Sequence, residues 1–262
     1  MKNERGKIIT ITSMKGGVGK SVFLLNLAGV YQRLGKKVLL VDLDFSSGAL
    51  ALSLNIPEKK TIYHALDDLM HNRFQKADDY ISSYNEWIDV IACPKDPRHA
   101  TKIEIRYLET FLERVSFSYD VILVDTTHGF SKNNIIIYDH SDMLIYLMSN
   151  DLMDLKNSKN FIAIMKDIEM DHFRVILNES YIPSENYFSD FDIRTMTEWG
   201  IDYTLSTKFY VKNLTGYLLE GVIPTLDDRT WEKKYQRDAN FLFKMASDFI
   251  GEEDEYGKED LH

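Results

Sequence analysis

The stretch from residue 7 to residue 21 most constrains how this chain can fold. An apolar, β-branched-rich run, KIITIT, leads into the glycine-rich SMKGGVGKS, and apolar residues at helical spacing follow. Strand, glycine-rich turn and helix in that order form a phosphate-binding loop, because the backbone N–H groups of the turn and the helix N-terminus both attract phosphate. Lys20 would reach the terminal phosphates, and the Ser21 hydroxyl would coordinate Mg²⁺.

The loop departs from the general pattern G-x-x-x-x-G-K-[ST], because Met14 stands where that pattern has glycine. It fits the narrower pattern KGG-x-GK-[ST], which brings a second lysine, Lys15, just before the glycines. From the residues alone, Lys15 is either a solvated loop residue or a contact to its own nucleotide's phosphates. The expected nucleotide contacts come from one continuous run: Gly16, Gly17, Val18, Gly19, Lys20, Ser21 and Val22.

Short apolar runs alternate with amphipathic stretches along the whole chain. The runs are rich in β-branched residues on both faces, which is typical of buried parallel strands. Strand and helix in alternation predict an α/β fold: a doubly wound, mostly parallel sheet with helices on both faces. The expected strands are 7–12, 37–43, 87–92, 119–125, 142–148, 173–178 and 202–206, and the expected helices are 20–34, 61–70, 102–115, 155–168, 209–220 and 231–250.

Three aspartates stand at the ends of predicted strands. Asp42 and Asp44 close the run VLLVDLD, and Asp125 closes VILVD. In a doubly wound sheet, ligands bind outside the carboxyl ends of the strands. A carboxylate there is well placed to hold Mg²⁺, usually through water. One such aspartate is commonly a turn residue, but three beside a phosphate loop predict a magnesium–nucleotide site.

Composition bounds the remaining possibilities. The net charge is -10, which disfavours non-specific DNA binding, although Lys233, Lys234 and Arg237 form a local basic cluster. Cys93 is the single cysteine, so the chain cannot build a disulfide or a Cys-rich metal site by itself. We expect a cytoplasmic protein without a secretion signal or a membrane span, made of one domain over residues 1–250 and an acidic, disordered tail over 251–262.

These motifs resemble the ParA/MinD family of ATPases with a deviant phosphate loop. The resemblance rests on KGGVGKS, VDLD and YDVILVD and extends over roughly residues 7 to 250. It implies ATP and Mg²⁺ as cofactors, slow ATP hydrolysis, and a homodimer formed through the nucleotide face. Lys15 matches the family's signature lysine, which crosses into the partner subunit and stabilises charge on the phosphates there, as an arginine finger does.

The same resemblance implies roles for other residues. Asp42 would hold Mg²⁺ through water, and Asp44 would orient the attacking water. Asp125 would be the Walker B carboxylate, which also faces the metal. Asn178, in VILNES, matches the family's adenine-contacting asparagine, and a plain turn residue is the alternative. The family often has Pro-x-Asp/Glu at the end of the next strand, where this chain has Ser206-Thr207-Lys208, so base specificity stays open.

Within the family, VDLDFSSGALALSLNI and residues 125–161 look most like the pilus-assembly branch of the CpaE/TadZ type. Such proteins usually carry a receiver-like domain, which has no place before Lys7. This implies a switch that positions or assembles a polar or cell-envelope machine such as a Tad/Flp pilus, with a protein partner that recruits it to a pole or to the inner membrane face. The alternatives are a ParA-like partition ATPase, a MinD/FlhG-like positioning ATPase, a metabolic P-loop ligase or kinase, and a nucleotide-binding scaffold without hydrolysis.

Overall fold

One mixed sheet organises the molecule. The computed structural model describes residues 4–57, 60–179, 188–205, 214–231 and 236–252. Within them, eight strands form a sheet in the order β3-β4-β2-β5-β1-β6-β7-β8, and only the β3–β4 pair is antiparallel. The strands are β1 (Lys7–Thr12), β2 (Val38–Leu43), β3 (Ser82–Ser83), β4 (Ile88–Ile91), β5 (Val121–Thr126), β6 (Met143–Met148), β7 (Phe173–Asn178) and β8 (Tyr203–Leu205).

The predicted fold class and the seven predicted strands are confirmed. The central strands β2, β5 and β6 are buried along their entire length, as expected of strands covered on both faces. The sequence did not predict β3, whose two residues are too few to show a periodic pattern.

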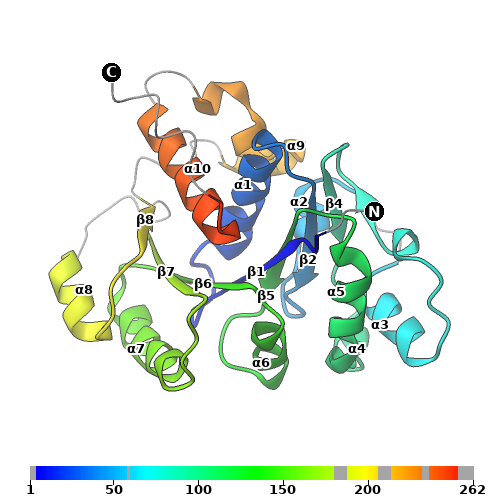
Figure 1. Ribbon diagram of the computed structural model, residues 1–262, viewed down its shortest axis with the longest axis horizontal. Coiled ribbons are helices and arrows are strands. Elements are labelled where there is room, and N and C mark those ends of the chain that lie inside the picture. The colour runs from blue at the N-terminus through cyan, green and yellow to red at the C-terminus, as the bar shows by residue number, and fades with distance from the viewer. Residues whose placement is uncertain (1–3, 58–59, 180–187, 206–213, 232–235, 253–262) are drawn as a thin grey trace.

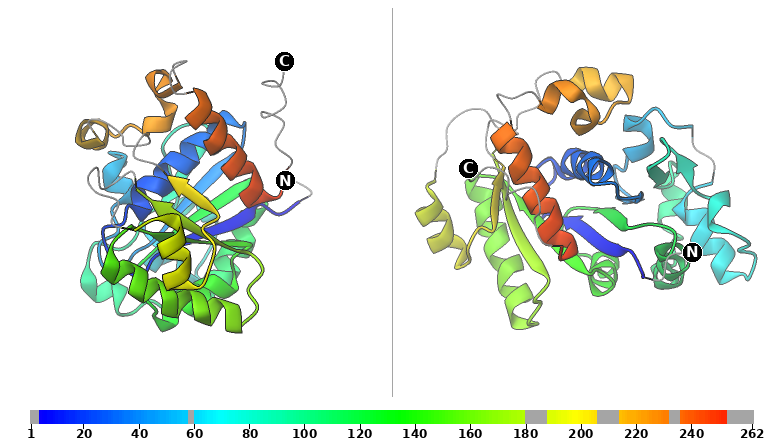
Figure 2. Two further views of the ribbon diagram at one scale, coloured as in Figure 1. Left: turned by 90° about the vertical axis from the view of Figure 1, so that its left-hand side faces the viewer. Right: turned by 45° about the horizontal axis from the view of Figure 1, so that its top comes forward.

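Helices cover both faces of the sheet (Figures 1 and 2). On one face, α1 (Lys20–Arg33) and α10 (Gln236–Ile250) bury apolar side chains against Ile9 and Ile11 of β1. On the other face, α3 (Ile62–Met70) and α5 (Leu108–Ser116) pack on β2 and β5, while α7 (Leu152–Asp167) and α8 (Asp190–Thr197) pack on β6 and β7. The shorter helices are α2 (Leu50–Ser53), α4 (Pro97–Ala100), α6 (Lys132–Asp139) and α9 (Leu214–Glu220).

Two predicted helices begin later than expected. The helix predicted over 102–115 starts at Leu108, after a 3-10 turn at Ile105–Tyr107. In the helix predicted over 231–250, residues 236–250 are helical, residues 232–235 lie outside the described part of the chain, and Trp231 is not in the helix. Trp231 belongs instead to the 3-10 turn η5 (Asp228–Trp231), because its indole Nε1 donates to the Thr225 carbonyl at 2.7 Å and ties it to the preceding turn η4 (Pro224–Leu226).

Some predictions fall outside the described residues. These are Ser206-Thr207-Lys208, the first part of the helix predicted over 209–220, Lys233, Lys234, and most of the predicted tail, 253–262. In the described part of the chain, no helix combines the length and the apolar character needed to cross a bilayer.

Candidate nucleotide-binding site

The glycine-rich loop leaves β1 and enters α1 at the carboxyl edge of the sheet. Its backbone requires glycine twice, because φ is +77° at Gly17 and +95° at Gly19. A side chain at position 19 would also collide with Asn178, whose Nδ2 would lie 2.8 Å from an added Cβ. Gly19 is the N-cap of α1, so the N-terminus of this helix opens directly onto the loop.

Lys20 and Ser21 form the first turn of α1. The Lys20 residue is only 7% exposed, so its charge is held close to the loop instead of in bulk solvent. The Ser21 hydroxyl donates to Asp125 Oδ2 at 2.5 Å. This bond joins the start of α1 to the end of β5, two elements that are about a hundred residues apart in sequence.

Asp42 and Asp125 lie side by side, because they are register partners in the β2–β5 ladder. Each is 1% exposed. Burial raises the pKa of Asp42 to about 7, and the neighbouring charge of Asp125 adds to that effect. Burial likewise raises the pKa of Asp125 to about 6, against the opposing effects of the Ser21 hydrogen bond and the Lys20 charge. Two buried carboxylates that resist ionisation together are arranged for a cation.

Asp44 organises the turn after β2. Its carboxylate accepts hydrogen bonds from the backbone N–H groups of Ser46 and Ser47 at 3.1 and 3.2 Å, and from the Ser47 hydroxyl at 2.9 Å. Asp44 is 6% exposed, so it lies at the site but is engaged with its own turn.

Gly48 belongs to the site, although the sequence analysis did not single it out. A Cβ at this position would lie 2.3 Å from Asp42 Oδ1, 2.5 Å from Cys93 Sγ and 2.6 Å from the Asp44 carbonyl oxygen. The turn therefore closes over Asp42 only with glycine. It continues into α2, where the N–H of Leu50 donates to Asp42 Oδ2 at 3.1 Å.

Lys15 pairs with a residue at the start of α7. Its Nζ lies 3.1 Å from Asp151 Oδ1, and its side chain is 42% exposed. Asp151 is the N-cap of α7 and accepts from the N–H groups of Met153 and Asp154, each at 3.1 Å. The ion pair lowers the pKa of Asp151, after the larger effect of the backbone hydrogen bond from Asp154. The two loop lysines thus occupy different environments, one buried and one at the surface.

Asn178 braces the phosphate loop. Its Nδ2 donates to the Val18 carbonyl at 2.8 Å across the site, from the end of β7 to the loop. The family resemblance implied an adenine contact for Asn178, with a turn residue as the alternative, and neither included this bond. The one sequence feature that pointed to Asn178 was its position at the end of a predicted strand, and the structure confirms that position.

The geometry fits Mg²⁺ with a nucleotide. Asp125 Oδ1 is buried and has no hydrogen-bond partner in the described part of the chain, so a metal-bound water would satisfy it. Among the described residues, no three His, Cys, Asp or Glu side chains converge on one point to hold a metal. Any Mg²⁺ here would take further ligands from Ser21, water and phosphate oxygens, which is how this ion is commonly held.

The chain matches a known protein family and several curated relatives. The family described as "AAA domain" matches residues 6–180. The septum site-determining protein MinD of Synechocystis is 25% identical over 173 residues, which cover 66% of this chain and 64% of that protein. For this and the other leading curated relatives, the chain spans less than two thirds of their length.

Solved structures share the fold along most of the chain. A ParA family ATPase from Chlorobium tepidum superposes with a TM-score of 0.75 at 18% identity, covering 92% of this chain and 98% of that one. The septum site-determining protein MinD of Pyrococcus horikoshii, solved with Mg-ADP, gives a TM-score of 0.72 at 22% identity and covers 93% and 95% of the two chains.

Proposed function

This chain belongs to the ParA/MinD family of P-loop ATPases, and we propose that it is an Mg²⁺-dependent ATPase switch that dimerises through its nucleotide face. The observation that carries the proposal is the contrast between the two loop lysines. Lys20 is buried at the start of α1, whereas Lys15 is exposed and paired with Asp151 on α7. A cation held outward at the rim of a nucleotide site is available to a second subunit.

Each site residue has a proposed role that its position supports. Lys20 and the backbone of residues 16–22 bind the phosphates, since the loop's N–H groups and the α1 N-terminus gather there. Ser21, Asp42 and Asp125 hold Mg²⁺, directly or through water. Bound Mg²⁺ would neutralise phosphate charge during hydrolysis. Asp44 would orient the attacking water after its turn with Ser46 and Ser47 loosens, and Asn178 would hold the phosphate loop through its bond to the Val18 carbonyl.

Lys15 completes the site from the neighbouring subunit in this proposal. To do so it must exchange Asp151 for a phosphate of the partner subunit's nucleotide. The exchange is inexpensive, because an exposed ion pair contributes only about 0.2–1 kcal/mol. Hydrolysis would remove the γ-phosphate and with it the reason for Lys15 to remain bound, so the dimer would then separate.

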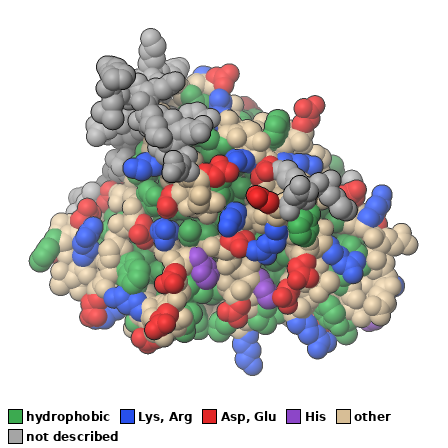
Figure 3. Space-filling view, viewed as in Figure 1, with side chains coloured by type: hydrophobic (Ala, Val, Ile, Leu, Met, Phe, Trp, Pro, Cys, Tyr) green, Lys and Arg blue, Asp and Glu red, His purple; other side chains and the backbone are tan. Residues whose placement is uncertain are grey.

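We further propose that residues 1–250 act as one domain that positions or assembles a polar or envelope machine such as a Tad/Flp pilus. This rests on the likeness of residues 125–161 to the CpaE/TadZ branch. A protein partner would recruit the cytoplasmic ATPase to a pole or to the inner membrane face. On the face shown in Figure 3, acidic and basic side chains are interspersed, which favours a protein partner over DNA there.

The deciding experiment is size-exclusion chromatography with light scattering. Wild type, Lys15→Ala and Asp44→Asn are compared without nucleotide and with ATP and Mg²⁺. The proposal expects a monomer that dimerises only with ATP in the wild type, a persistent dimer in Asp44→Asn, and no dimer in Lys15→Ala. Lys132→Ala, a change to an exposed lysine of α6, is the matched control and should behave as wild type.

An unchanged oligomeric state in all variants would contradict the switch. It would leave a scaffold or a monomeric enzyme. Loss of ATP binding in Lys15→Ala, measured separately by calorimetry, would instead assign Lys15 to its own nucleotide.

A further inference from the structure

A second groove lies far from the phosphate loop, at the other end of α1. It is lined by Gln32, Arg33, Trp87, Leu226, Trp231 and Phe243 and has a volume of about 620 Å³. Trp87 directly precedes β4, and Arg33 is the last residue of α1. The groove therefore opens at the amino edge of the sheet, whereas the nucleotide site lies at the carboxyl edge. The 14 residues of α1 separate the two sites by about 20 Å at 1.5 Å per residue.

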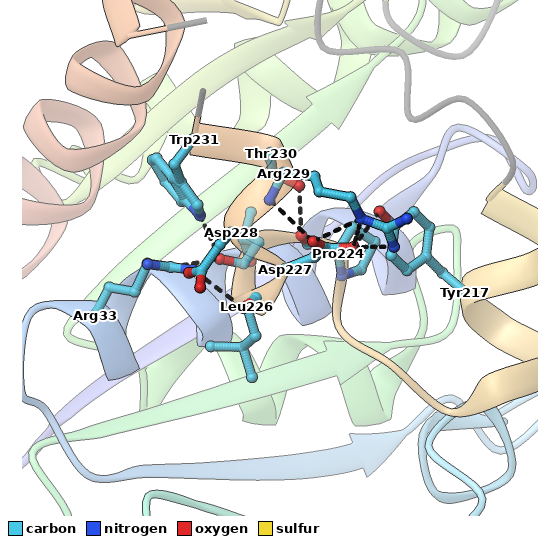
Figure 4. Close-up of polar contacts among 10 residues, drawn as sticks. Arg33, Tyr217, Pro224, Leu226, Asp227, Asp228, Arg229, Thr230 and Trp231 are labelled. Atoms are coloured by element: carbon cyan, nitrogen blue, oxygen red, sulfur yellow. Dashed lines mark hydrogen bonds and ion pairs between the residues drawn. The ribbon is translucent and has the colours of Figure 1, made fainter. Parts of the chain in front are cut away.

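Arg33 forms a rigid wall of this groove (Figure 4). Its Nε donates to the Thr225 carbonyl at 2.7 Å, and its Nη2 donates to the Leu226 carbonyl at 3.0 Å. The guanidinium carbon lies 5.1 Å from the centre of the Trp231 ring, as in a cation–π contact. Because Trp231 also donates to the Thr225 carbonyl, the arginine and the indole are fixed relative to each other.

Further hydrogen bonds stabilise the two turns that carry Leu226 and Trp231. Asp227 accepts hydrogen bonds from both the backbone N–H and the guanidinium of Arg229, and the Tyr217 hydroxyl donates to its Oδ2 at 2.8 Å. The Thr230 hydroxyl donates to the Pro224 carbonyl at 2.7 Å. Figure 4 shows these contacts gathered on one side of Arg33. A ligand in the groove would meet preformed walls and would not have to order them.

The backbone of Trp87, which also lines the groove, is fixed as well. Asn85 accepts from the N–H groups of Trp87 and Ile88 at 2.8 and 2.9 Å, and its Nδ2 donates to Gln32 Oε1 at 2.9 Å. These bonds tie the backbone of Trp87 to α1. The Trp87 residue is nevertheless 40% exposed, which is a large apolar surface to leave in water.

The Arg33 guanidinium in the groove already binds a carboxylate of the chain itself. Asp228 places a carboxylate oxygen 2.8 Å from Arg33 Nη2, while 96% of the Asp228 side chain stays exposed. This carboxylate is held by one contact at the surface, so an incoming carboxylate can replace it at little cost. Within the described residues, the Nη1 donors of Arg33 make no hydrogen bond, which leaves room for a second bond to an incoming carboxylate.

We propose that this groove binds a segment of a protein partner in which a large apolar side chain lies next to a carboxylate. The apolar side chain packs between Trp87 and the Trp231–Phe243 wall, and the carboxylate takes the place of Asp228 on Arg33. Tryptophan and arginine are the residues that most often dominate the binding energy of protein interfaces. The partner differs from a second copy bound at the nucleotide face, because the groove is at the opposite edge of the sheet.

The test is isothermal titration calorimetry with acetylated, amidated pentapeptides. Three peptides carry one Phe and one Asp, with the Asp one, two or three positions from the Phe. Three control peptides carry Lys in place of Asp. At least one Asp peptide should bind the full chain with a dissociation constant of about 0.1–1 mM, and its Lys partner should bind at least about tenfold more weakly.

Two variants are expected to change peptide binding in opposite directions. A misfolded variant could only lose binding, so the variant that binds more tightly must be folded. Trp87→Ala should weaken binding about tenfold, because it removes one wall. Asp228→Ala should tighten it about threefold, because it removes the competing carboxylate. Phe191→Ala, at an exposed aromatic residue on α8, is the control and should bind as wild type. Absence of binding by all three Asp peptides, equal binding of the Lys partners, or indifference to Trp87→Ala would each overturn the proposal.

Discussion

Lys15 Nζ contacts Asp151 Oδ1 at 3.1 Å, so the extra lysine of the phosphate loop is held by the N-cap of α7. Both side chains are about 40% exposed. The pair links the nucleotide loop to the helix that begins after β6. Any movement of Lys15 toward a second nucleotide must first break this contact.

Asp151→Asn should therefore favour the ATP-bound dimer. Asparagine caps a helix about as well as aspartate, so α7 is preserved while the charge that holds Lys15 is lost. An exposed ion pair contributes about 0.2–1 kcal/mol. A homodimer gives up two such pairs, so the dimer dissociation constant should fall by about two- to thirtyfold. Analytical ultracentrifugation with ATP and Mg²⁺ measures this constant. Asp167→Asn, at the other end of the same helix, is the control, and an equal effect there would refute a specific role for Asp151.

Gly48→Ala should destabilise the protein and disturb the magnesium site. The added Cβ would lie within 2.6 Å of Asp42, Cys93 and the Asp44 carbonyl, so the turn has to shift. Overpacking of this kind typically costs about 1–3 kcal/mol. Urea unfolding should show the loss for Gly48→Ala but not for Gly200→Ala, whose Cβ would meet no atom within 4 Å. Equal midpoints for the two variants would contradict the close approach at Gly48.

The stability of the nucleotide-free protein should fall as pH rises. Burial raises the pKa of Asp42 to about 7 in the folded state, above the usual value of 3.8, so the folded state holds its proton more tightly. This contribution is complete below about pH 4 and disappears as the pH passes about 7. Urea unfolding at pH 5 and pH 8 should show a smaller pH effect in Asp42→Asn than in wild type. An identical pH effect would show that Asp42 ionises normally.

Asn178→Ala should weaken nucleotide binding without regard to the base. The hydrogen bond from the Asn178 side-chain amide to the Val18 carbonyl holds the phosphate loop. Leaving that buried carbonyl unpaired costs about 1–3 kcal/mol. If that bond is the main role, ATP and GTP should lose affinity by the same factor in calorimetry. A loss confined to ATP would instead support the adenine contact that the family resemblance implies.

The sequence predicted the fold and the centre of the site because both follow from local patterns. Apolar strands alternating with helices fix a doubly wound sheet, and the aspartates Asp42 and Asp125 necessarily meet at its carboxyl edge once β2 and β5 pair in parallel. The sequence could not predict the contacts of Asp151 or Gly48, which arise only when distant elements converge. Asp151 did carry a signal, since an aspartate before a helix commonly caps it. The prediction was wrong to include Trp231 in the last helix, because its hydrogen bond to the Thr225 carbonyl depends on tertiary structure.

The positions of the three tryptophans decide what the protein's own fluorescence can report. Trp87 and Trp231 line the groove at the end of α1, and Trp199 packs against Phe173, the first residue of β7. All three lie toward the amino edge of the sheet, so bound nucleotide would touch none of them. A change in indole emission on adding ATP would therefore signal a rearrangement transmitted through the whole domain, and an unlabelled sample would suffice to observe it in real time.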